Sequence, residues 1–359
     1  MLDRPRAPRD TSPHRVARVH ELAEAGDDAG LAAELVDLAA ADGDAWRHDV
    51  HAELRALPVG RRGALILRVI ERATTATPPV RAERLLVGLL EGVPADALSW
   101  RAGRYLVEAV SAWVAAAPEI LAVLAGVAER ETGECPPALL AVMRRTAHEG
   151  DKRWPARYRA PIQPWLDRAA GGLNAGEPWA EAANAATPGP ALLVHALAAS
   201  GAKPASRWTR QARALLPEAG GDETRALIRG WFALVPHRRT IPLRPLDGRW
   251  DPNEIPDAYN ARALRGLLYL LAVTPPHDDD AAAVGRLVQY SAEKVPGHGP
   301  RSQMLAHAGI HALERFSTVP ALRELARLRS MGQPLGIASA LTAAIARRGV
   351  ALGVDPARL

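Results

Sequence analysis

The residues Val295 to Ser302 form the stretch whose types and spacing come closest to a binding site. Gly297 and Gly299 allow the backbone to approach an anion closely, and the free N–H groups of the next helix face the same turn. Lys294 and Arg301 would add positive charge. The stretch predicts either a phosphate-binding corner or a plain connector between helices. The connector is the simpler interpretation, because glycine and proline end helices without any ligand.

The same stretch resembles the turn of a helix-hairpin-helix motif, where a Gly-x-Gly loop offers backbone N–H groups to a DNA phosphate. Such turns usually have an apolar residue between the glycines, whereas this chain has His298. That difference favours a structural turn. If the loop binds phosphate, its affinity should fall steeply with salt.

The segment that follows the loop is basic. Between Arg301 and Leu359 there are eight arginines and three acidic residues, so the balance is 8 − 3 = +5, which equals the formal net charge of the whole chain. A nucleic-acid surface could therefore include Arg323 and Arg327 together with the loop. Solvated helix faces give the same composition. A second basic run, from His237 to Arg249, is expected to be a solvated loop.

A groove for a protein partner is a further possibility. Trp208 and Trp231 lie in neighbouring helical segments, and Arg262 and Arg265 flank an apolar helix face. Tryptophans at such positions more often anchor a core. Asn260 is expected to satisfy a backbone group between neighbouring helices, which is a structural role.

Metal and cofactor chemistry have little support in the sequence. His307 and His311 lie four residues apart with Glu314 one turn further on, but there is no His-Glu-x-x-His pattern, so packing is the expected role. The acidic runs 27–28 and 278–280 precede helical segments and are expected to cap them. The chain has neither a Gly-x-Ser-x-Gly motif nor a phosphate loop of the Gly-x-x-x-x-Gly-Lys type. We expect no metal and no cofactor.

The composition indicates an α-helical protein. The 359 residues are 48% hydrophobic but only 4% aromatic, and alanine and leucine outnumber the β-branched and aromatic residues that strands prefer. Cys135 is the single cysteine, which excludes an internal disulfide and a cysteine-based zinc site. We expect no signal peptide and no apolar run long enough to span a bilayer, hence no membrane association and a cytoplasmic location.

Breaker residues divide the chain into many helices of 12 to 18 residues. The expected organisation is a flexible leader at 1–13, N-terminal helical repeats at 14–150, an irregular Pro- and Trp-rich connection at 151–190, and C-terminal helical repeats at 191–359. The fold class is therefore all-α, as an α-solenoid of degenerate HEAT-like antiparallel helix pairs. Two globular helical bundles are the alternative.

Four short motifs occur in order in the C-terminal half: Lys203–Trp208, Asn260 with Leu264–Leu267, Val295–Ser302 and Leu325–Ser330. The run from about 191 to 359 resembles the helical (HEAT-like) repeat region of bacterial WGR proteins, including molybdate-metabolism-regulator-like proteins with a C-terminal domain of unknown function. The resemblance implies HEAT-like architecture. No WGR signature is present, and no catalytic residue is implied.

These observations predict a non-enzymatic scaffold that binds a protein partner on a concave face. The alternative is a HEAT-like protein that binds DNA or RNA through the arginine-rich final helices and the 296–302 loop. A more remote alternative is a DNA-repair enzyme of glycosylase type, since HEAT-like folds that bind damaged DNA exist.

Overall fold

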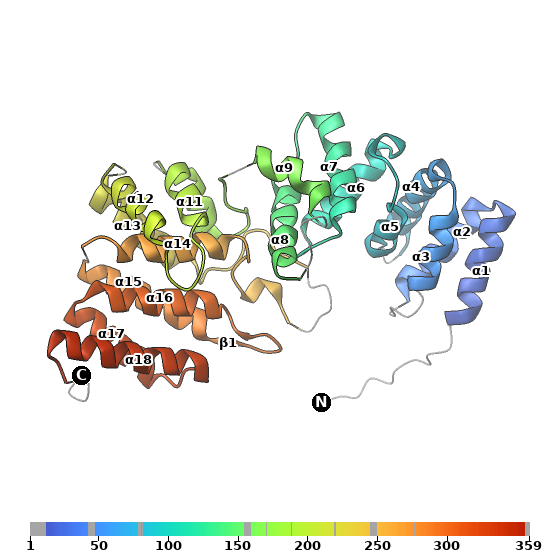
Figure 1. Cartoon of the computed structure of the whole chain (residues 1–359). Coiled ribbons are helices and arrows are strands. Elements are labelled where there is room, and N and C mark those ends of the chain that lie inside the picture. Colours follow the sequence, from blue (N-terminus) through green and yellow to red (C-terminus); the bar gives the residue numbers. More distant parts are fainter. Residues whose placement is uncertain are drawn as a thin grey trace. The chain divides into compact units, whose positions relative to one another are not determined.

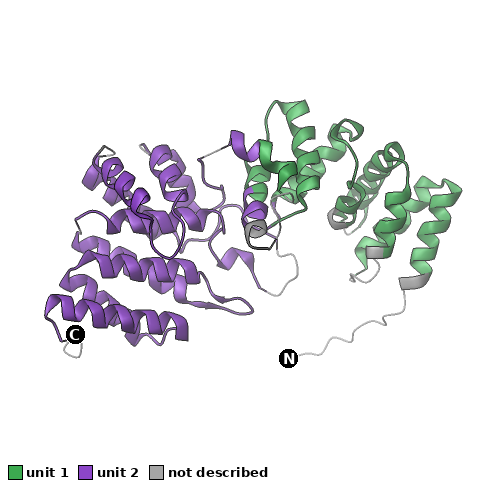
Figure 2. Cartoon of the chain, in the orientation of Figure 1, with its two compact units in different colours: residues 1–111, 115–143, 156–164 green, residues 112–114, 144–155, 165–359 purple. Residues whose placement is uncertain are grey.

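A computed structural model describes residues 12–41, 47–77, 80, 82–153, 159–169, 171–187, 189–218, 220–244, 250–275 and 277–355. Within these ranges the chain forms eighteen α-helices, and its strands are two residues long (Figure 1). The prediction of an all-α protein is confirmed. Most of the expected leader, residues 1–11, lies outside the described ranges. The chain divides into two compact units (Figure 2).

Unit 1 comprises Met1–Ser111, Ala115–Met143 and Ala156–Pro164. Its helices pack as two rows, α1, α3 and α5 in one and α2, α4 and α6 in the other, with α7 against α6. The elements are α1 (Ser12–Ala25), α2 (Asp28–Ala40), α3 (Arg47–Ala56), α4 (Val59–Thr75), α5 (Glu83–Leu89), the 3₁₀ turn η1 (Ala95–Ala97), α6 (Trp100–Ser111), α7 (Pro118–Thr132) and η3 (Ala160–Ile162). The chain passes between the units within α8 (Pro137–Arg153) and α9 (Gln163–Arg168).

Unit 2 comprises Ala112–Val114, Arg144–Pro155 and Trp165–Leu359. Beyond parts of α8 and α9, it contains α10 (Pro178–Ala185), α11 (Gly189–Leu197), α12 (Ser206–Glu218), α13 (Gly221–Leu234), η4 (Pro252–Glu254), α14 (Asn260–Ala272), α15 (Asp278–Ala292), β1 (Lys294–Val295), β2 (Gly299–Pro300), α16 (Gln303–Phe316), α17 (Val319–Ser330) and α18 (Leu335–Leu352).

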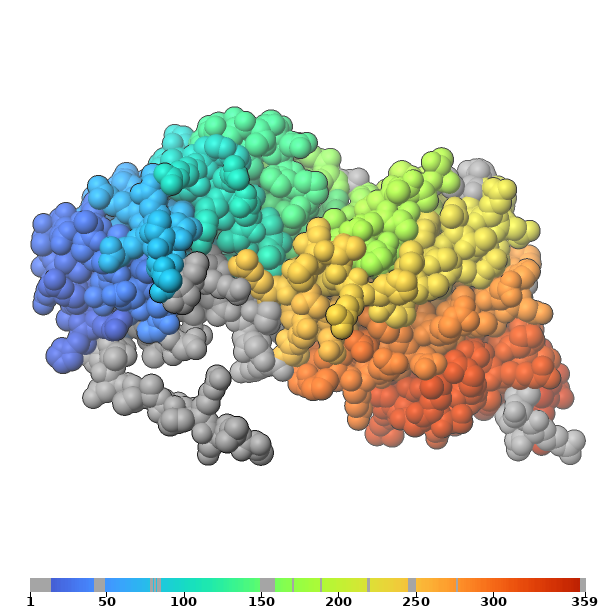
Figure 3. All heavy atoms as spheres, turned by 180° about the vertical axis from the view of Figure 1, so that it is seen from behind, coloured from blue at the N-terminus to red at the C-terminus, as the bar shows by residue number. Residues whose placement is uncertain are grey.

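The helices of unit 2 also pack as two rows. One row runs α10, α13, α15, α17, and the other runs α11, α14, α16, α18. Helices consecutive in the chain, such as α15 and α16 or α17 and α18, connect the rows. In the space-filling view the colour of this part of unit 2 runs from orange to red, following the order of the chain (Figure 3). Each helix therefore buries its apolar face mainly against its neighbours in the array.

Polar caps fix where several helices begin. The Asp27 carboxylate accepts a hydrogen bond from the N–H of Gly30 at 2.9 Å, and Asp280 accepts one from the N–H of His277 at 3.1 Å in a capping box. The expectation that the two acidic runs cap helices is confirmed. Helix α10 lies within 151–190, the segment that the sequence predicts to be irregular. The sequence does not predict this helix because it is short and has few apolar positions.

One sequence-based expectation is wrong. By length and composition, α18 is apolar enough to cross a membrane, and it is the one described helix that passes this test. It packs on α16 and α17 through Ile337, Leu341 and Ala344, while Leu335 and Val350 are each 86% exposed. A core helix of a soluble protein can pass the same test, so α18 does not by itself indicate a membrane protein.

The contact between α14 and α11 requires glycine at position 266. A Cβ atom there would lie less than 3.0 Å from backbone atoms of Ala196. Backbone cannot rotate away as a side chain can, so the two helices would have to separate. Gly230 in α13 is different, since a Cβ atom there meets nothing within 4 Å.

We therefore expect opposite effects from two matched substitutions. Gly266→Ala should lower the free energy of unfolding by about 1–3 kcal/mol through overpacking. Gly230→Ala should raise it by roughly 0.5–1 kcal/mol, because alanine loses less backbone entropy in a helix. Urea denaturation followed by tryptophan fluorescence measures both. Equal effects of the two changes would contradict the close approach of α14 and α11.

Candidate functional site

A buried cluster in unit 2 contains residue types that often carry chemistry. Asp257 accepts from Arg145 Nη1 at 2.9 Å, and Glu177 lies 3.4 Å from Arg239 Nη1. Arg239 Nη2 is also 3.7 Å from Asp257. The Asp257 side chain is 0% exposed and those of both arginines 4%. Burial and the neighbouring Asp257 charge raise the pKa of Glu177.

Amides and backbone groups complete this cluster. Asn260 donates to the Asn174 carbonyl at 2.9 Å and to Glu177 at 2.8 Å, and its own side-chain oxygen accepts from the Asn174 N–H at 2.7 Å. Asp257 also accepts from the N–H groups of Tyr259 and Asn260, which begins α14. The structural role expected for Asn260 is confirmed. Because the carboxylates are buried and accept hydrogen bonds from donors within the protein, the cluster stabilises the fold rather than forming a reaction site.

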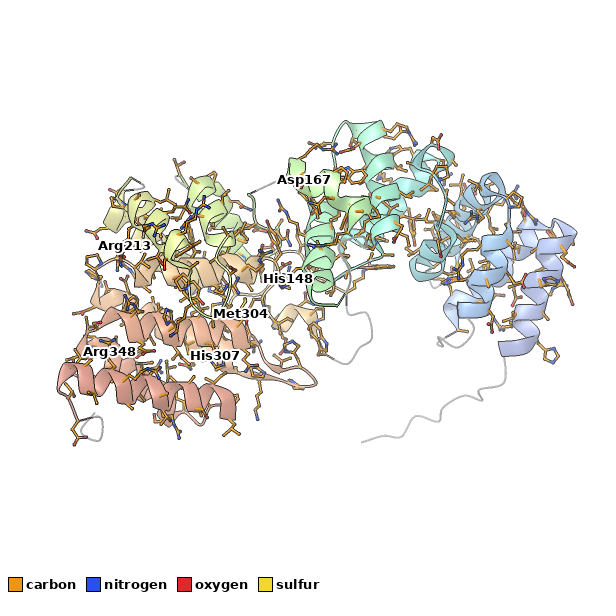
Figure 4. All side chains as sticks on the ribbon, in the orientation of Figure 1. His148, Asp167, Arg213, Met304, His307 and Arg348 are labelled. Carbon is orange, nitrogen blue, oxygen red and sulfur yellow. The ribbon has the colours of Figure 1, made fainter. Side chains whose placement is uncertain are left out.

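A pocket of about 310 Å³ in unit 2 is accessible and has unbalanced charge. We call it the basic pocket. Its walls come from the loop before α12, from α12, from the C-terminal ends of α14 and α16, and from α18. The lining residues are Lys203, Pro204, Thr209, Ala272, Val273, His311, Glu314, Arg315 and Arg348. Arg348 is labelled in Figure 4.

Side chains of α14 hold the loop that brings Lys203 to the pocket. Arg262 donates to the Leu197 carbonyl at 3.5 Å, Arg265 donates to that of Ala199, and the Tyr269 hydroxyl donates to that of Ala202 at 2.9 Å. These donors are three and four residues apart and share one face of the helix. They satisfy carbonyls at and beyond the end of α11, where a helix leaves its last carbonyls without intrahelical partners.

The pocket has more cations than carboxylates. Glu314, the one carboxylate among its described lining residues, binds Arg347 through two bonds of 2.7 and 3.1 Å, and this pairing lowers the pKa of Glu314. Lys203 and Arg315 form no ion pair within the described residues. Arg348 donates to the Ser317 hydroxyl at 2.9 Å. The remaining positive charge is available to a ligand.

His311 lies in the same pocket, edge-on to Tyr269 at a ring-centroid separation of 5.7 Å. Burial lowers its pKa most, and the charges of Lys203 and Arg315 lower it further, against an opposing effect of Glu314. The imidazole is therefore neutral at pH 7. It can donate one hydrogen bond and accept another.

The pocket was missed from the sequence because its residues are far apart in the chain. The sequence predicts a packing role for His311, and it places Glu314 beside it only as an alternative metal ligand. Lys203 was considered only as part of a motif, although it is one of three lysines in the chain. In the described part of the chain no three His, Cys, Asp or Glu side chains gather as a metal site requires. His307, labelled in Figure 4, does not line the pocket.

The glycine loop singled out in the sequence is a β-hairpin, in which β1 and β2 pair with Val295 opposite Gly299. The N–H of His298 donates to the Val295 carbonyl at 3.1 Å, and Gly297 has φ +76°, as in a type II turn with proline second and glycine third. The N–H of Arg301 donates to the Glu293 carbonyl at 2.8 Å. These two N–H groups are used within the hairpin, as in a structural turn.

The basic residues proposed for nucleic acid lie in and just after the hairpin and on α17. Arg301 packs over Tyr290 at 4.9 Å and binds Glu293 at 3.3 Å. Arg327 binds Glu324 at 2.6 Å and donates to Gln289 at 3.1 Å. Lys294 and Arg323 are exposed. Arg301, Tyr290 and Gln289 line a second pocket of about 410 Å³ with Pro236, Arg286 and Glu293.

The residues proposed for a partner groove are largely internal. Trp208 is 6% exposed and Trp231 4%, and both belong to the core of unit 2. Trp208 stacks on His195 and donates to its carbonyl at 2.8 Å. The core-anchor interpretation therefore holds for both. Arg239, expected in a solvated loop, is instead buried in the cluster around Asp257, while Arg249 lies outside the described residues.

Comparisons with known proteins gave no match, whether with protein-family models, curated proteins or solved structures.

Asp257→Ala should lower the free energy of unfolding of unit 2 by about 3–5 kcal/mol, because it leaves the buried charge of Arg145 without its partner. Asp279→Ala is the control, since its side chain is 70% exposed and pairs only with His277 among the described residues. It should cost no more than about 1 kcal/mol. Urea denaturation measures both, and a loss below 1 kcal/mol at Asp257 would contradict the stabilising role.

Burial also lowers the pKa of His195 and His311 in the folded protein. Both unfolded imidazoles take up a proton near pH 6.5, while the folded ones stay neutral, so the unfolded state binds more protons. The stability that these two histidines contribute should therefore be complete above this pH and fall as pH decreases below it. His311→Gln should flatten that fall in urea titrations between about pH 7.5 and 5.5. An unchanged slope would show that His311 is not buried in its neutral form.

Proposed function

We propose that this protein is a non-enzymatic helical-repeat scaffold that binds an acidic segment of a protein partner, and that it works in the cytoplasm. We further propose that its helix pairs form a degenerate HEAT-like α-solenoid. The two rows of helices in each unit support this architecture, because the helices in these rows pack mainly on helices one to three positions away in the chain. The resemblance to WGR-linked repeat regions remains part of the same proposal.

The four motifs behind that resemblance have distinct places in unit 2. Lys203 lines the basic pocket, Asn260 lies in the buried cluster, and Val295 to Ser302 includes the hairpin. Leu325 and Leu328 are core residues of α17. Three of the motifs thus contribute to folding and one contributes to the basic pocket, which fits a scaffold better than an enzyme.

The observation that carries the proposal is the unbalanced charge of the basic pocket. Lys203, Arg315 and Arg348 face a common space in which Glu314 is already neutralised by Arg347. Cations at a surface attract acidic partners and set the orientation in which they bind. The protein segment that fits this pocket is one rich in aspartate or glutamate.

Nucleic acid is the second candidate, and the pocket beside Tyr290 favours it. Arg286, Arg301 and the aromatic ring of Tyr290 line the same space. Arginines with an aromatic ring are typical of single-stranded nucleic-acid surfaces. However, Glu293 and Glu254 offset the charge of Arg301, and Glu324 offsets that of Arg327. We therefore rank an acidic protein segment first.

Fluorescence anisotropy can separate the two candidates. A short fluorescein-labelled peptide rich in glutamate should bind the full chain at low salt. The double variant Arg315→Glu/Arg348→Glu should weaken it at least about tenfold, since it reverses two of the pocket's charges. Arg301→Glu should leave peptide binding nearly unchanged. Circular dichroism establishes that each variant is folded.

A labelled DNA duplex and a labelled single strand provide the opposing measurement. Tight binding of either strand form that falls steeply with salt and is lost in Arg301→Glu would reverse the ranking. Failure of the acidic peptide to bind the wild-type chain at low salt would overturn the acidic-segment proposal.

A further inference from the structure

The basic pocket has a feature that a site for carboxylates does not require, namely several cations around one small space. Lys203 comes from the loop before α12, Arg315 from the end of α16, and Arg348 from α18. A single carboxylate carries one negative charge and would leave this set partly unbalanced. A phosphate monoester carries up to two charges and three acceptor oxygens. Its oxygens can be approached by donors from several sides at once.

The strained backbone of unit 2 lies beside this pocket. Ser317 is the one non-glycine residue with positive φ among the described residues, at +56°, and it ends α16. Its hydroxyl accepts from Arg348 at 2.9 Å and donates to the Arg315 carbonyl at 3.1 Å. A glycine would adopt this conformation without strain, whereas serine adopts it at a cost in backbone strain. What serine adds in return is its hydroxyl group. It fixes one edge of the Arg348 guanidinium.

Arg348 also has a hydrogen-bond donor that is not used within the protein. Its Nε–H is shielded from solvent and has no hydrogen-bond partner within the described residues. An unsatisfied donor beside a pocket can bond to an acceptor that a ligand supplies. Because Nη1 of Arg348 donates to Ser317, its Nε–H is the donor that could bind a ligand oxygen. Such charge-assisted bonds are stronger and more directional than those of lysine.

We propose that the basic pocket binds a phosphate monoester, carried on a phosphorylated serine or threonine of the protein partner. This rests on the proposed function and specifies its ligand. Arg348, positioned by Ser317, contacts the phosphoryl oxygens together with Arg315, while Lys203 adds a third charge from the loop before α12. Neutral His311 supplies a hydrogen bond. The volume of about 310 Å³ suits a phosphoryl group with the side chain that bears it.

The test uses the full chain and three labelled peptides of one sequence, with phosphoserine, serine or glutamate at the central position. Anisotropy at fixed salt and pH gives each affinity. The phosphoserine peptide should bind at least about tenfold more tightly than the serine peptide and more tightly than the glutamate peptide. Equal affinity of the phosphoserine and glutamate peptides would overturn the phosphate preference and leave the proposed function intact. Failure of all three to bind would overturn both.

Matched variants locate the site. Arg348→Gln should reduce affinity for the phosphoserine peptide about tenfold or more. Arg213→Gln removes the same charge from an exposed position on α12, labelled in Figure 4, and should change affinity less than about twofold. Equal losses in the two variants would reduce the effect to net charge and overturn the pocket assignment.

Ser317 needs a measurement that a purely structural role would not affect. Ser317→Gly suits the positive φ, so the melting temperature should not fall, but affinity for the phosphoserine peptide should fall about three- to tenfold because Arg348 loses its anchor. Unchanged affinity would show that Ser317 does not position Arg348.

Inorganic phosphate distinguishes the source of the phosphoryl group. It should compete with the labelled phosphoserine peptide only at concentrations far above the peptide's dissociation constant, because it makes no contacts beyond the pocket. If it binds as tightly as the peptide, and Arg348→Gln abolishes that binding, the pocket is a site for free phosphate or a small phosphate ester. That result would overturn the assignment to a protein partner.

Discussion

The buried ion pair between Asp257 and Arg145 is the interaction around which unit 2 is organised. The Asp257 carboxylate joins Arg145, Asn174 and the first turn of α14, and Arg145 in turn donates to the backbone carbonyls of Trp113 and Val114. In a buried site these charges cannot be left unpaired, so segments far apart in the sequence must arrive together. The cluster thereby fixes where α14 starts and how it is oriented.

That orientation is transmitted along α14 to the basic pocket. From its start beside Asp257, the helix presents Arg262, Arg265 and Tyr269 to the carbonyls that follow α11. The loop held in this way ends at Lys203, which faces the ends of α16 and α18. A structural cluster without access to solvent therefore positions a cation at the surface through one rigid helix.

The charges of the arginine-rich final helices are not equivalent. Arg301, Arg327 and Arg347 are each paired with a glutamate, whereas Lys203 and Arg315 have no such partner in the described part of the chain. Net charge alone would have treated them alike. A pairing between α16 and α18, such as Glu314 with Arg347, depends on which helices are neighbours, and this determines which cations remain for a ligand.

The sequence by itself determined the all-α class, most helix positions, the acidic caps and the structural role of Asn260, because caps, breakers and apolar spacing act over a few residues. It could not determine that Arg239 is buried or that Lys203 meets Arg315 and Arg348. Those facts depend on contacts between residues tens of positions apart, for which local spacing carries no information. Tertiary packing alone decided which charged side chains form ion pairs and which line a pocket.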